Sequence, residues 1–204
     1  MTVSDRPILL DYVADQGHKV FDGPHLYDMN MIGIRARPVD GVYPVTDRFD
    51  DRLCLVYRDE NGFVTRTWKV TTDPGRWWMQ HGRTDGTAVL AFGQYRASHK
   101  LGMHRGSYEA MVQRGGGTVR VHRDADKDEE YDLEPDSVDV GKFGINIHRA
   151  SAHRETETVG RYSAGCTVFA DPDDFAAFLS ICKRQVEGNG WETFTYTLVP
   201  EPMM

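Results

Sequence analysis

One stretch of the chain, residues 143 to 169, carries the residue types of thiol chemistry. His148 ends an apolar, β-branched run, and Cys166 follows directly after a Ser-Ala-Gly corner. A cysteine nucleophile needs a base that takes its proton and backbone N–H donors that stabilise the developing oxyanion. Gly165 lets the chain turn tightly enough to present both the thiol and such donors. The pattern therefore favours a catalytic pair of Cys166 and His148.

Two short strands are expected to position this pair. Ile145, Ile147 and His148 predict a strand that carries the imidazole at its C-terminal end, and residues 167 to 169 predict a second strand that leaves the cysteine. The polar segment His-Arg-Glu-Thr-Glu-Thr-Val-Gly between them is typical of a connecting loop. The cysteine and the histidine are thus expected on neighbouring β elements.

The remaining sequence predicts a mainly β architecture, either two packed sheets or a partly closed barrel, with one or two peripheral helices. Two alternating runs flank Asp59-Glu60-Asn61-Gly62, which is a strong hairpin signal. An apolar stripe after Asp171 and Pro172 predicts a helix that ends near Gly188 or Gly190, and residues 193 to 198 alternate as in a strand with one buried face.

Length and composition bound the domain organisation. A chain of 204 residues with 40% hydrophobic residues can form one domain with a sizeable core. We expect residues 1–30 to form an N-terminal helical segment, with a short helix within residues 7 to 21, packed on a single main domain of residues 31–204. The helical spacing of Ile8, Leu9, Tyr12 and Val13 supports this expectation.

Charge narrows the classes of partner. The formal net charge of −7 argues against nucleic acid and against anionic membranes, because their binders use basic surfaces. No segment has the composition of an export signal or a membrane span, so the expected location is the cytoplasm. Cys54, Cys166 and Cys182 lack CxxC spacing, which speaks against a disulfide framework and a thiolate zinc site, although a Cys54–Cys182 bridge stays open.

Several weaker signals have structural interpretations. Trp77 and Trp78, with the nearby Phe92 and Tyr95, are expected to pack in the core. Residues 107 to 111 suggest a helical turn.

An acidic run follows the predicted strand near residue 120. Asp124, Asp126 and Asp128 stand at alternate positions as in calcium loops, but Glu129 and Pro135 replace the glycine and the glutamate that an EF-hand requires. A solvated charge run is therefore the expectation, with cation binding left open.

The central motif resembles that of the YkuD-type L,D-transpeptidases. That family has His-Gly, a loop, and then Ser/Thr-His-Gly-Cys followed by Val or Ile and Arg. Ser163, Gly165 and Cys166 match, and His148 stands at a spacing that the family shows. Arg149, Ala164 and Val168 depart from the pattern.

The motif covers only about residues 144 to 168. The hairpin-rich stretch from residue 32 to 75 and the segment around Gly-Met-His-Arg-Gly are also similar to peptidoglycan-acting proteins of this type from phages and prophages.

The resemblance implies an L,D-transpeptidase-like fold, no cofactor, no metal, and peptidoglycan stem peptides as the partner. Cys166 would be the nucleophile and His148 the base, with the Arg149 carbonyl orienting the imidazole. The backbone N–H groups of Ala164, Gly165 and Cys166, next to Ser163, would form the oxyanion hole. His104 and His153 could flank the site, although each is expected on the surface.

The sequence leaves three functions open for this site. We expect hydrolysis, as in an endolysin that is stored in the cytoplasm and released to the wall. A cross-linking enzyme works outside the membrane, and no segment here has the composition of an export signal. The alternative is an L,D-transpeptidase that passes the acyl group to an amine, and a further alternative is a non-catalytic wall-binding module. A metallopeptidase built on His99, His104, His122 and aspartates is a poor fit, because the chain has no HExxH motif.

Overall fold

The computed structural model of the chain describes residues 6–202 and is mainly β, as predicted. The strands are β1 (Asn30–Arg35), β2 (Asp51–Asp59), β3 (Gly62–Thr71), β4 (Thr87–Leu90), β5 (Gly93–His104), β6 (Tyr108–Val112), β7 (Val119–Asp124), β8 (Val138–Gly141), β9 (Ile147–Arg149), β10 (Thr167–Phe169) and β11 (Thr193–Pro200). The helices are α1 (Ile8–Asp15), α2 (Arg76–His81) and α3 (Pro172–Asn189), with a 3-10 turn, η1 (Pro135–Ser137).

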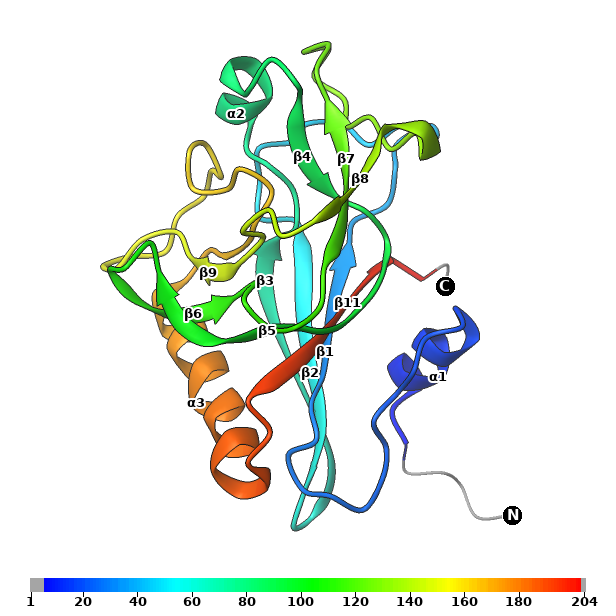
Figure 1. Ribbon diagram of the computed structural model, residues 1–204, viewed down its shortest axis with the longest axis vertical. Helices are drawn as coiled ribbons and strands as arrows, with labels where there is room; N and C mark the ends of the chain where they lie inside the picture. Colours follow the sequence, from blue (N-terminus) through cyan, green and yellow to red (C-terminus); the bar gives the residue numbers. More distant parts are fainter. Residues whose placement is uncertain (1–5, 203–204) are drawn as a thin grey trace.

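Eight strands close into a barrel in the order β1-β11-β5-β6-β9-β10-β3-β2, and β2 returns to β1. The remaining strands form a small sheet in the order β4-β7-β8. Figure 1 shows this sheet and α2 beyond one end of the barrel, with α3 and α1 on opposite sides of it. The candidate motif lies on β9 and β10, which are adjacent strands of the barrel.

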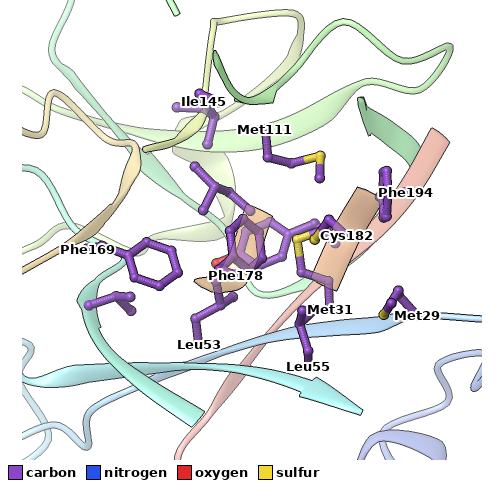
Figure 2. Packing of buried hydrophobic residues seen from close by; sticks show 14 of the residues in the cluster. Met29, Met31, Leu53, Leu55, Met111, Ile145, Phe169, Phe178, Cys182 and Phe194 are labelled. Carbon is purple, nitrogen blue, oxygen red and sulfur yellow. The ribbon is translucent and has the colours of Figure 1, made fainter. Parts of the chain in front are cut away.

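The main core forms where one face of the barrel strands meets α3. Leu53 and Leu55 of β2 belong to this core, whereas the intervening Cys54 belongs to a second cluster on the other face, as the two-residue period of a strand requires. Figure 2 shows Phe178 and Cys182 of α3 among the buried side chains of the main core. The predicted apolar stripe of α3 is confirmed by this packing.

The ends of α3 agree with their sequence signals. The side chain of Asp171 accepts a hydrogen bond from the Asp173 N–H at 2.7 Å, which satisfies a helix N-terminal donor. Gly190 adopts a left-handed conformation at the C-cap, with φ of 69°.

Helix α1 packs on the outer face of the barrel. Its Leu10 and Val13 are buried against Ile32, Ile34 and other residues of the second cluster. The division of the chain into residues 1–30 and 31–204 stays a prediction, and residues 1–5 and 203–204 lie outside the described part. Among the described helices, none is long and apolar enough to cross a membrane.

The structure corrects three local predictions. Residues 108 to 112 form strand β6 in a hairpin with β5, not a helical turn. Strand β11 is buried on both faces, with Thr197 only 3% exposed. Its Tyr196 and Leu198 belong to the main core, whereas its Val199 belongs to the second cluster, which includes residues of α1. Trp77 and Trp78 lie half-buried on α2 rather than in the core, although Tyr95 is buried as expected.

Candidate functional site

Strands β9 and β10 bring the predicted pair into one neighbourhood. They run parallel, with His148 beside Val168, and the Thr167 N–H donates to the Asn146 carbonyl at 3.0 Å. Cys166 therefore lies one position before β10 and two residues before Val168, which pairs with His148. With strands about 4.8 Å apart and a rise of about 3.3 Å per residue, this register places the two residues close together.

Hydrogen bonds and a glycine fix the corner that precedes Cys166. The buried Ser163 hydroxyl donates to the Cys166 carbonyl at 2.8 Å and accepts from the Gly165 N–H at 3.2 Å. Gly165 has a φ of 110°, and a Cβ at this position would overlap the Ala88 carbonyl oxygen. The corner thus requires glycine for its backbone angle and for its closeness to β4.

The thiol of Cys166 is partly exposed and has two backbone partners. The Asn146 N–H donates to Sγ at 3.4 Å, and the thiol donates to the Gly144 carbonyl at 3.4 Å. Burial raises the pKa of the Cys166 thiol, while the Asn146 N–H and the positive charge of Arg105 act in the opposite direction. The resting group is therefore a neutral thiol with a donor already directed at its sulfur.

The imidazole of His148 is buried and oriented by its neighbours. Its Nδ1–H donates to the Arg149 carbonyl at 2.9 Å, which is the contact that the sequence resemblance implied. The Tyr108 hydroxyl lies 3.3 Å from the same nitrogen and also donates to this carbonyl. Burial, with His104 beside it, lowers the pKa of His148 to about 3, so the ring is neutral near pH 7 and Nε2 carries a free lone pair.

His104 is a buried neighbour of His148, so its predicted surface position is wrong. The two rings lie 4.1 Å apart between centroids, and His104 is 7% exposed. The Asn146 side-chain amide lies 3.2 Å from His104 Nδ1. We assign the amide nitrogen as donor, which leaves the proton of His104 on Nε2. The exposed position predicted for His153 is confirmed.

Within the described chain, no hydrogen bond joins Cys166 to His148. The Cys166 thiol nevertheless lies close enough to Tyr108, a contact of His148, to contribute to the raised pKa of that phenol, which burial chiefly causes. Catalytic hydrogen bonds are often long before a substrate is bound. Proton transfer from this thiol to this imidazole thus needs a local adjustment of the two side chains.

Two cavities meet beside the nucleophile corner. One, of about 320 Å³, is lined by Cys166, Asn146, His104 and the basic side chains of Arg105 and Arg114, among others. The second, of about 360 Å³, is lined by Trp78, Arg123 and Lys142, among others. Ala88, Phe143 and Ala164 line both cavities, so together they form a two-sided site around the corner.

No known protein family, curated protein or solved structure was found to match this chain. The likeness to the L,D-transpeptidases therefore rests on the sequence motif alone.

The expected oxyanion donors are only partly free. The N–H of Gly165 is committed to Ser163, which differs from the expectation that three consecutive N–H groups face the substrate. In the described structure, the N–H groups of Ala164 and Cys166 donate no hydrogen bond, so these two remain as candidate donors.

The histidine metal site is not formed. Both ring nitrogens of His99 are engaged, by Ser98 and by the Ile145 carbonyl, and burial lowers the pKa of His99 to about 4. His122 contacts the Glu134 carbonyl through Nδ1 and lines a different cavity. In residues 6–202, the one group of side chains with metal-ligand spacing is Asp124, Asp126 and Asp132, which contains no histidine.

Several residues of this site were not predicted from the sequence. Asn146 and Gly144 contact the thiol through their backbone, and Tyr108 reaches the site from β6, so residue type gives no signal for them. The alternation of Asn146 and His148 along one strand is a signal that could have indicated Asn146.

Proposed function

We propose that this chain is a cysteine-dependent acyl-transfer enzyme of the L,D-transpeptidase type, which acts on peptidoglycan stem peptides and releases the acyl group to water. One observation carries the proposal: the Cys166 thiol lies at a glycine corner with a backbone N–H on its sulfur, beside a strand whose imidazole is oriented through Nδ1. This arrangement supplies a nucleophile and an oriented base.

The proposed reaction proceeds in two steps. His148 Nε2 takes the thiol proton while Sγ attacks the carbonyl carbon of the stem peptide, and the C–N bond then breaks as the imidazolium protonates the leaving amine. Water next attacks the thioester, with His148 again as base, and the products are a carboxylate and the free thiol. The N–H groups of Ala164 and Cys166 stabilise the two tetrahedral oxyanions.

Charge around the cavities supports an anionic peptide substrate. Arg105, Arg114 and Lys142 line the cavities and form no ion pair with any described residue, although the chain as a whole carries a net charge of −7. Stem peptides carry free carboxylates, which such side chains bind. This local excess of cations favours binding of an acidic peptide across the corner.

Water is the favoured acceptor because Cys166 is partly exposed, so water reaches an acyl group on its sulfur. The cavity beside Ala164 favours a second candidate function, since it offers room for an amine acceptor and hence for transpeptidation. We also propose that the protein is held in the cytoplasm and released to the wall, as expected for the phage and prophage proteins that the sequence outside the motif resembles.

Mass spectrometry of purified muropeptide dimers and tetrapeptides incubated with the protein decides between these functions. Hydrolysis predicts cleaved peptides without new cross-links. Accumulation of 3,3-linked dimers or of D-amino-acid exchange products would establish transpeptidation instead. Binding to isolated peptidoglycan without any covalent change in it would favour the non-catalytic module.

A further inference from the structure

Three carboxylates converge where β7 ends, on the small sheet. Asp124, Asp126 and Asp132 each present one side-chain oxygen, and these oxygens lie within 4.8 Å of one another. The alternate spacing in the sequence pointed to Asp128, but the chain turns between these residues. The Asp128 carboxylate accepts a hydrogen bond from the Glu130 N–H instead.

Asp124 is buried, and one of its two carboxylate oxygens has no hydrogen-bond donor among the described residues. The residue is 2% exposed, and its Oδ1 is buried without a hydrogen-bond partner in the described structure, whereas Oδ2 accepts from the Asp132 N–H at 3.0 Å. A buried carboxylate oxygen without a partner is costly, so such an oxygen points to a bound ligand as its partner.

The surrounding charges add to this argument. No ion pair between described residues involves Asp124, Asp126 or Asp132. The three carboxylate oxygens lie within 4.8 Å of one another with no described cationic side chain paired to them. The group therefore combines repulsion between carboxylates with a buried oxygen that has no donor, and both are relieved by a cation.

We propose that Asp124, Asp126 and Asp132 bind a calcium ion. Oxygen-only ligands select hard cations such as Ca²⁺ and Mg²⁺. Because each ligand lies about 2.3–2.6 Å from Ca²⁺, two ligands of one ion can be about 5 Å apart, which suits the spread of these oxygens. Mg²⁺ requires a tighter, near-octahedral arrangement, and an irregular loop is poorly suited to provide it.

The calcium ion would hold a loop that supports one wall of the candidate site. From this loop, the Glu129 carboxylate accepts hydrogen bonds from Arg76 and Gln80 of α2, each at 2.6 Å. The Tyr131 hydroxyl donates to the Pro74 carbonyl at 2.7 Å, and the adjacent Gly75 N–H donates to the Ser163 carbonyl at 2.9 Å. Calcium would thus stabilise the contacts that seat α2 and the Ser163 corner.

Calorimetric titration of the chelator-treated full chain with CaCl₂ tests this inference, with thermal unfolding as a second readout. We expect one ion per chain and a higher Tm in the presence of Ca²⁺. Asp126→Asn and Asp132→Asn should each weaken calcium binding at least about tenfold. Asp128→Asn is the matched control, because it removes the same charge from the same loop and should leave the affinity within about twofold.

Three results would overturn the assignment. One is the absence of both heat and a Tm shift up to about 10 mM CaCl₂, well above the weakest calcium sites of proteins. Another is an equal loss of affinity in the Asp128→Asn control, which would indicate general screening of charge. The third is binding of Mg²⁺ as tight as that of Ca²⁺. These readouts do not depend on the proposed peptidase activity.

Discussion

Cys166 and Cys182 are two thiols whose pKa values are raised by burial, yet their surroundings differ. Cys182 lies on the apolar face of α3, 0% exposed, and no described residue offers it a polar contact. Cys166 lies at a strand entrance, with the Asn146 N–H and the Gly144 carbonyl on its sulfur and a cavity in front of it. Burial alone therefore does not separate a structural thiol from a reactive one. Positioned polar groups and access do.

The largest expected effect is that of removing the Cys166 sulfur. Cys166→Ala should lower peptidoglycan cleavage at least about 1,000-fold, because no other group can form the acyl-enzyme. Release of soluble fragments from isolated peptidoglycan measures this loss. The Cys54→Ala/Cys182→Ala double variant is the control, and it should lose stability while keeping the chemical step. Loss of chemistry in the folded control would show that another thiol reacts.

The next largest effect concerns the base. His148→Ala should lower the rate about 100- to 10,000-fold, the range for loss of a general acid–base group. His153→Ala removes an exposed histidine of the same region and should leave the rate unchanged. A larger loss in His104→Ala than in His148→Ala would transfer the role of base to His104.

A third prediction tests the corner itself. Gly165→Ala should destabilise the fold by about 2–4 kcal/mol, because it combines a strained backbone angle with overlap at the Ala88 carbonyl. Gly116→Ala is the control, since a Cβ there meets no atom within 4 Å and the backbone angle is ordinary. Urea unfolding measures both variants, and equal stability of the two would contradict the geometry of the corner.

The smallest effect sharpens the contrast between the two thiols. Because burial raises the pKa of Cys166 above its ordinary value of 9.0, the thiolate fraction should rise about tenfold per pH unit between pH 7 and 9. Iodoacetamide labelling of the folded protein should follow this rise at Cys166 and leave Cys182 unlabelled. A labelling rate that is already constant near pH 7 would mean a preformed thiolate and would contradict the neutral pair.

Much of the fold could be predicted from the sequence, because its signals are local. The hairpin at Asn61-Gly62, the capped helix after Asp171 and the strand after Cys166 follow from turn residues, capping and alternation. Burial of β11 on both faces could not be predicted, since its second face packs in a cluster with α1, which is distant in the sequence. The half-exposed positions of Trp77 and Trp78 likewise depend on where α2 lies.

The candidate site also contains residues that could be predicted from the sequence and residues that could not. Cys166, Gly165 and His148 are visible in the sequence because their chemistry depends on residue type. The positions of Tyr108 and His104 are set by pairing of β5, β6 and β9, and those of the Asn146 and Gly144 backbone groups by the path of the chain. The acidic group was likewise only partly predicted. The alternate spacing indicated Asp128 as its third member, but the turn of the chain brings Asp132 beside Asp124 and Asp126 instead.

Intact-protein mass spectrometry can detect the acyl-enzyme that Cys166 is proposed to form. The wild-type chain is mixed with a purified muropeptide tetrapeptide, quenched with acid at short times, and digested to locate any adduct. We expect a transient thioester on Cys166 in the wild type and none in Cys166→Ala. Cleavage of the peptide by Cys166→Ala at the wild-type rate, without an adduct on any cysteine, would contradict this role of Cys166.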